Sequence, residues 1–242
     1  MRIILLLFLA FFLKAETLSA TYIAKYGLLG TVAKAGAVME TNETAYKIYT
    51  ETKTLGLVAS LSKHMVQTYV SIGKIKNGVL IPDYYVAIRT KDNYISKRVY
   101  IFDHKNKKIR RLKYRNGKLE TNTTLPYYCK DDVLTLYFNL SKYVKNYNDS
   151  RTFYALGGRK GDGRIDVSFP KGEELENLRD DFDNEKGIYI KADLYNKIFV
   201  GDKGVLYLVI NPQHWITMRA MVKNVLKIGD LKGKIKSFRL IP

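Results

Sequence analysis

The sequence predicts a mainly β fold, with one continuous antiparallel sheet and one or two short covering helices. The first observation is a polarity alternation of period two, clearest at Ile188–Tyr195, where Ile, Ala and Leu alternate with Tyr, Lys and Asp. The second is the content of 19 Tyr and 10 Phe, since aromatic side chains pack well on a pleated surface. The third is a set of Gly-containing turns, among them Asn77-Gly78 and Asn116-Gly117. Together these features favour a single sheet layer over a helical bundle.

The remaining strand candidates are short segments that alternate in polarity or are rich in β-branched and aromatic residues. In chain order they are Ala45–Thr54, Met65–Lys74, Tyr84–Thr90, Tyr94–Asp103, Lys108–Tyr114, Thr152–Gly157, Arg164–Phe169, Val205–Ile210, Trp215–Val222 and Lys232–Leu240. Val205–Ile210 follows Asp202-Lys203-Gly204, which predicts a hairpin around Phe199–Val205.

Two segments break this rhythm and predict helices. Asp131–Val144 places apolar residues three and four apart, which gathers them on one helical face, and Asp131 or Asp132 is suited to be its N-cap. We expect this helix to be the lid of a ligand cavity. The lid residues are Val133, Leu136, Tyr137, Leu140 and Val144. Glu173–Arg179 is a shorter helix candidate within an acidic stretch.

The first residues have the layout of a secretory signal peptide. A positive start at Arg2 precedes the apolar run Ile3–Leu13, and small residues suited to cleavage follow. Eleven apolar residues are far fewer than the roughly 20 that a membrane-spanning helix needs. We therefore expect a cleaved signal peptide at 1–15, with 20 as the alternative end, and a single β-rich domain at 16–242. The protein is then periplasmic, has no stable membrane span, and meets no nucleic acid.

The chain carries a strong positive charge, +18 at pH 7. Between Arg89 and Lys118 there are twelve basic residues against two acidic ones. The predicted basic surface comprises Lys97, Arg98, Lys107, Lys108, Arg110, Arg111 and Lys113. It either protects a sheet edge or contacts an anionic envelope polymer, lipid headgroups or an acidic protein. Lys outnumbers Arg 29 to 12, which favours ordinary solvated surface over a site dedicated to binding phosphate.

The apolar residues of the arm Lys108–Tyr114 lie three apart, which predicts a bulge or a twisted arm.

No pattern of catalytic residues is visible. His64, His104 and His214 are not spaced to share a metal ion, and Cys129 is the only cysteine. We expect no disulfide, no metal, no cofactor and no enzymatic activity, and we expect Cys129 to lie in the core.

Two asparagines match a glycan acceptor pattern. Asn42 and Asn122 satisfy the N-x-[ST] rule, and each has an acidic residue two positions earlier. Asn122 lies between Asn116-Gly117 and Pro126, so we expect it on an accessible loop and prefer it as the modified site.

Several stretches in order resemble the exported bacterial proteins of domain-of-unknown-function family 3108. They are Ala20–Ala35, Ser71–Tyr85, Tyr100–His104, Asp131–Leu140 and Lys223–Ile235. The resemblance implies an open half-barrel, similar to that of periplasmic lipoprotein carriers such as LolA, with helices across its concave face. Asn139-Leu140 departs from the family, in which Leu-Arg is common at this place. The family has no assigned activity, so no functional residue is transferred.

Two functions follow as hypotheses. The first is a non-catalytic binding or carrier protein for an apolar or lipid-like ligand, which a cavity under Asp131–Val144 would favour. The second is a structural or interaction protein of the cell envelope. A filled core and a continuous basic face over Arg89–Lys118 would favour the second.

Overall fold

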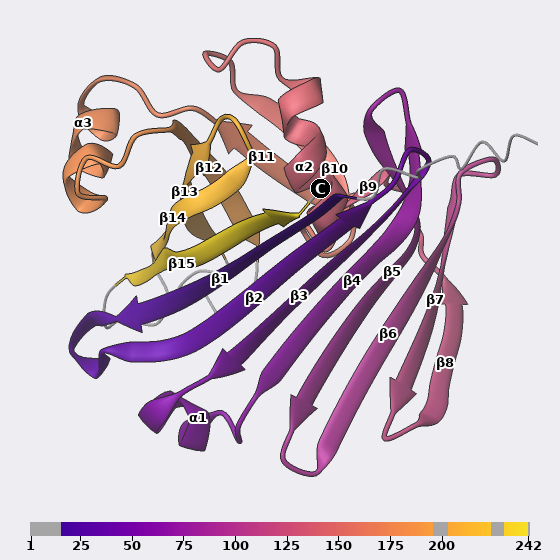
Figure 1. Ribbon diagram of the computed structural model, residues 1–242. Coiled ribbons are helices and arrows are strands. Elements are labelled where there is room, and N and C mark those ends of the chain that lie inside the picture. Colours follow the sequence, from indigo (N-terminus) through magenta and orange to yellow (C-terminus); the bar gives the residue numbers. More distant parts are fainter. Residues whose placement is uncertain (1–15, 196–202, 224–229, 242) are drawn as a thin grey trace, which may run out of the picture.

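Fifteen strands form one curved, open sheet in the order β8-β7-β6-β5-β4-β3-β2-β1-β15-β14-β13-β12-β11-β10-β9 (Figure 1). The structure is a computed structural model that describes residues 16–195, 203–223 and 230–241. The predicted signal peptide at 1–15 lies outside these residues, as do residues 199–202 of the predicted hairpin. β8 and β9 are the sheet edges, and antiparallel pairing of β1 with β15 joins the two halves.

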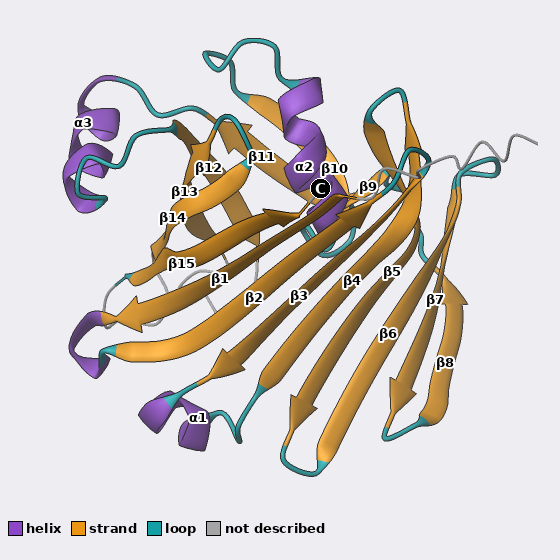
Figure 2. Ribbon diagram, in the orientation of Figure 1, coloured by secondary structure: helices purple, strands orange, loops and turns teal. Residues whose placement is uncertain are grey.

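The N-terminal half is a series of antiparallel hairpins. It contains β1 (Glu16–Tyr26), β2 (Thr31–Thr41), β3 (Ala45–Thr54), β4 (Val66–Lys76), β5 (Val79–Lys91), β6 (Tyr94–Asp103), β7 (Lys108–Arg115) and β8 (Lys118–Thr124). The C-terminal half contains β9 (Asp131–Asp132), β10 (Arg151–Leu156), β11 (Arg164–Ser168), β12 (Ile188–Tyr195), β13 (Lys203–Asn211), β14 (Ile216–Lys223) and β15 (Leu231–Ile241). The helices are a 3-10 turn at Gly27–Leu29, α1 (Gly56–Leu61), α2 (Val133–Tyr143) and α3 (Gly172–Asp181) (Figure 2).

The predicted mainly β class is confirmed, and each predicted strand has a counterpart. The β4–β5 and β7–β8 turns form as predicted. In them Asn77 and Gly78 have φ of 53° and 72°, and Asn116 and Gly117 have φ of 45° and 83°. Two positive φ values in succession suit a tight hairpin turn.

Some elements were not predicted or differ from prediction. β1, β2, β8, β9 and α1 were not expected, so the described residues hold three α-helices rather than one or two. The pairing of Lys108–Tyr114 with β6 runs without a register shift. Ile109 and Leu112 lie an odd number of residues apart, so they face opposite sides of the sheet. The bulge predicted for this arm lies on its other side, in the pairing with the edge strand β8, where the register shifts between Lys113 and Tyr114.

The sheet curves around α2. Leu136 and Leu140 pack against the C-terminal half, with Ile190 and Trp215, whereas Phe138 packs against Ile48 and its neighbours in the N-terminal half. A helix that contacts both halves requires the sheet to wrap it, and we call the side facing α2 the inner face. α3 packs on the opposite, outer face of β12–β14 (Figure 1).

Candidate ligand-binding site

An apolar hollow of about 280 Å³ lies on the inner face beside α2. Side chains of β1–β3 form one wall, α2 forms a second, and the start of β14 with Trp215 forms a third. The lining residues are Leu18, Ala20, Tyr22, Ala37, Val38, Met39, Ile48, Thr50, Leu134, Tyr137, Phe138, Trp215, Ile216 and Thr217. Its volume is close to the lower end of small-molecule pockets, roughly 300 Å³.

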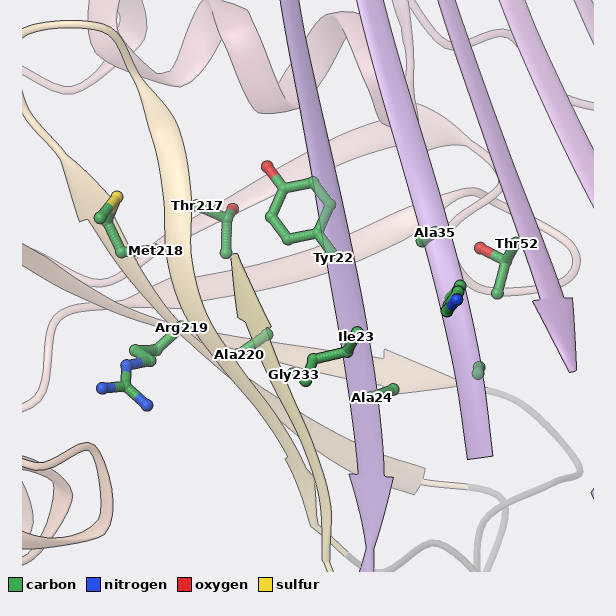
Figure 3. Close-up of a pocket in the computed structure, with 12 residues that line it drawn as sticks. Tyr22, Ile23, Ala24, Ala35, Thr52, Thr217, Met218, Arg219, Ala220 and Gly233 are labelled. Atoms are coloured by element: carbon green, nitrogen blue, oxygen red, sulfur yellow. The ribbon is translucent and has the colours of Figure 1, made fainter. Parts of the chain in front are cut away.

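A second hollow of about 140 Å³ continues along the same strands, away from α2 (Figure 3). Tyr22 and Thr217 line both hollows, so the two adjoin. The second is lined by Tyr22, Ile23, Ala24, Ala33, Lys34, Ala35, Thr52, Thr217, Met218, Arg219, Ala220 and Gly233. We call the two together the apolar trough.

Small side chains explain why the trough is empty of protein atoms. On β1 and β2 the inner positions pair as Ala20 with Ala37, Tyr22 with Ala35, and Ala24 with Ala33. All six side chains project from the inner face, and only that of Tyr22 is large. The sheet therefore leaves a depression that its own residues do not fill.

Hydrogen bonds hold α2 at the rim of the trough. The Tyr137 hydroxyl donates to the Trp215 carbonyl oxygen at 3.1 Å and lies 3.0 Å from Thr217 Oγ1. In return Trp215 Nε1 donates to the Tyr137 carbonyl oxygen at 2.6 Å. Burial raises the pKa of Tyr22, on the facing wall, to about 12. Hydrogen bonds between the neutral groups of Tyr137, Trp215 and Thr217 thus fix the rim.

A buried polar cluster fastens the start of α2 to β3 and β4. Asp132 caps the helix, because its Oδ1 accepts from the backbone N–H of Leu134 at 2.8 Å and of Thr135 at 3.0 Å. Its Oδ2 accepts from Ser71 Oγ at 2.6 Å, and Ser71 Oγ lies 3.0 Å from the Tyr46 hydroxyl. Burial raises the pKa of Asp132 to about 7, although the hydrogen bonds favour its charged form.

Asn139 fastens the middle of α2 to β5. Its Oδ1 accepts from the Leu80 N–H at 2.9 Å, and its Nδ2 donates to the Leu80 carbonyl oxygen at 2.9 Å. Nδ2 also donates to Asp131 Oδ1 at 2.8 Å, and the Tyr143 hydroxyl donates to Asp131 Oδ2 at 3.0 Å. Burial raises the pKa of Asp131. All the named polar groups are paired, so this cluster holds α2 against the sheet.

The five predicted lid residues divide between two roles. Tyr137 lines the trough, but Leu136, Leu140 and Val144 are buried in the core against β10–β13, and Val133 packs at its edge. Sequence reasoning missed Leu134 and Phe138, which line the trough from the other side of the helix. Their i, i+4 spacing beside the predicted stripe was the available signal, because a helix that is apolar on two sides lies between two walls.

The seven predicted basic residues do not form one surface. Strand alternation places Arg98, Arg111 and Lys113 on the inner face, in register with one another and with Tyr100. The other four lie on the outer face or in a turn: Lys97, Lys107, Lys108 and Arg110.

The two candidate glycan acceptors are exposed, but not where expected. Asn122 lies within edge strand β8, where its Oδ1 accepts from Arg110 Nε at 2.7 Å, so its expected loop position is wrong. The β8 strand forms because residues 118–124 pair with β7. Asn42 lies in the β2–β3 turn, and its Oδ1 accepts from the Ala45 N–H at 2.7 Å. Modification at either site stays a prediction.

Cys129 lies in the core as predicted, at 1% exposure, and burial raises the pKa of its thiol to about 12. Within the described residues, no three His, Cys, Asp or Glu side chains gather as metal ligands. None of the helices in the part described has both the length and the apolar content to cross a membrane.

Neither a protein-family model nor a curated protein matches the chain. The resemblance to family 3108 therefore stays a prediction. Among solved structures the chain is similar to a β-barrel-like protein of domain of unknown function DUF1849 from Brucella abortus. The two share 8% sequence identity with a TM-score of 0.49, over 94% of this chain and 98% of that one.

Proposed function

We propose that the protein is a non-catalytic binding or carrier protein of the periplasm that holds an apolar or lipid-like ligand in the apolar trough. The observation that carries this proposal is a hollow with an almost wholly apolar lining, closed on one side by a helix that hydrogen bonds of Tyr137, Asp132 and Asn139 fix to the sheet. Apolar surface buried there contributes about 25 cal/mol per Å². The leader-like residues 1–15 support the periplasmic location.

The alternative is an envelope protein that uses its basic surface for contact. Two features predicted for that role were a filled core and a continuous basic face. The trough beside α2 and the division of the basic residues between two faces favour the binding function.

Native mass spectrometry of protein purified from the periplasm of its own host tests the proposal. We expect a species heavier than the mature polypeptide, whose extra mass is lost on denaturation and is recovered as lipid or another apolar compound. Ala37→Phe, which fills the trough, should remove this adduct, whereas Val86→Phe on the outer face of β5 should keep it. A bare polypeptide mass together with a co-purifying envelope protein would support the alternative.

A further inference from the structure

The inner face changes from apolar to cationic across the sheet. Alternation along β5–β7 places five basic side chains on the same side as the trough, with Tyr85 and Tyr100 between them and α2. These residues, which we call the cationic zone, are Arg89, Arg98, Arg111, Lys113 and Arg115.

Charge in the cationic zone is only partly compensated. Glu120 pairs with Lys113 Nζ at 2.5 Å and with Arg115 Nε at 2.6 Å. In the described part of the chain, Arg89 and Arg98 have no carboxylate at ion-pair distance. The Nε of Arg111 is buried without a hydrogen-bond partner among the same residues. The exposed guanidinium groups of Arg89 and Arg98 are therefore available to an anion, whereas Arg111 donates to Thr123 Oγ1 at 3.3 Å.

Arg89 and Arg98 share a hollow of about 100 Å³. It is lined by Gln67, Tyr69, Ala87, Ile88, Arg89, Tyr94, Ser96 and Arg98. Ser96 on β6 is the cross-strand partner of Arg89 on β5. Arg98 follows Ser96 by two residues on the same face, so Arg89 and Arg98 are diagonal neighbours, with roughly 7–8 Å between their positions. Their long side chains reach one anion from two directions, and each guanidinium offers a fork of donors.

Strand register places this hollow next to the apolar trough. Thr52 lines the trough, and its partner across the β3–β4 ladder, Gln67, lines the cationic hollow. Closer to α2, Thr50 and Tyr69 are also cross-strand partners, and again the first lines the trough and the second lines the cationic hollow. Paired strands lie about 4.8 Å apart, so an apolar group and an anionic group of one small molecule span the two sites.

We propose that the ligand is an amphiphile with an anionic head, a phosphate or a carboxylate, which Arg89 and Arg98 bind while its apolar chain occupies the trough. This inference rests on the proposed binding function and adds the chemical class of the ligand. Gln67, Tyr94 and Ser96 supply neutral polar groups around the head.

Isothermal titration of the purified protein with decyl phosphate, decanol and inorganic phosphate, each in monomeric solution, tests this inference. We expect decyl phosphate to bind at least about tenfold more tightly than decanol, the factor that one charge-assisted hydrogen bond supplies. The double substitution Arg89→Gln with Arg98→Gln should remove this preference and leave decanol binding unchanged. The control, Lys76→Gln with Lys97→Gln, makes the same change in net charge at exposed outer positions and should keep the preference.

The outcomes separate the two proposals. Equal binding of decyl phosphate and decanol, or an equal loss of preference in the control, would overturn the anionic-head inference while leaving the binding function in place. Inorganic phosphate that binds as tightly as decyl phosphate would show an anion site not coupled to the trough, and would also overturn it. No binding of either decyl compound would contradict the proposed function itself.

Discussion

The two ends of the inner face are built differently. At the α2 end, large side chains such as Ile48 and Tyr85 are buried, and Asp132 and Asn139 tie the helix to the sheet. At the other end β2 and β3 carry Ala33, Ala35 and Thr52, which leave the smaller hollow of the trough open. The difference teaches that one strand can contribute a packed core at one end and a binding surface at the other.

The largest expected effect comes from breaking the packed end. Leu136→Asp should lower the free energy of unfolding by about 4 kcal/mol or more, because it buries an unpaired charge at a position only 4% exposed. Chemical denaturation measures this loss. Lys142→Asp, exposed on the same helix, should cost less than about 1 kcal/mol. Similar stabilities for the two variants would contradict the packing described for α2.

The fastening of α2 should also make stability depend on pH. Folding raises the pKa of Asp132 from its ordinary value near 4 to about 7, so the folded state holds a proton that the unfolded state has lost between these values. The free energy of unfolding should therefore fall as pH rises from about 4 to about 7, by up to about 4 kcal/mol, and then level off.

Asp132→Asn gives the matched control for this pH dependence. Asn retains an N-cap acceptor and donates to Ser71 without a charge, so the fall in stability over that pH range should be much smaller. Parallel stability curves for Asp132→Asn and the unmodified protein would show that another group is responsible.

A smaller effect distinguishes the packed core from the trough directly. Ala155→Leu, at a position with 0% exposure beside α2, should cost about 1–3 kcal/mol because it overpacks the core. Ala37→Leu projects into the trough and should cost less than about 1 kcal/mol. Thermal melts of both variants check the comparison, and an equal cost would mean that the trough is as tightly packed as the core.

The same small residues explain what the sequence could and could not predict. Strands β3, β6 and β12 were predicted to the residue. β12 shows the clearest signal, because Ile, Ala and Leu alternate with Tyr, Lys and Asp along it. β1 and β2 were missed as strands, since Ala, Gly, Ser and Thr give a weak alternation. Those two strands form the floor of the trough. Their small side chains weaken the polarity pattern in the sequence and also leave the space in which a ligand can bind.

The sequence also could not predict which residues pair across neighbouring strands. The approach of Asn139 to Leu80 and the neighbourhood of Thr52 and Gln67 depend on register between segments far apart in the fold. The helix at Asp131–Val144 could be predicted from its period, but its two-sided packing follows only from the curvature of the sheet.

Trp215 provides the most direct test of the claim that the trough binds an apolar ligand, because it is the only tryptophan and lines the trough. Titration with an alkyl phosphate brominated at the end of its chain should quench Trp215 fluorescence in a saturable way, at one molecule per protein. Ala37→Phe should abolish this saturable quenching, and Val86→Phe on the outer face should retain it. Quenching that rises linearly without saturation, or that persists in Ala37→Phe, would contradict the account.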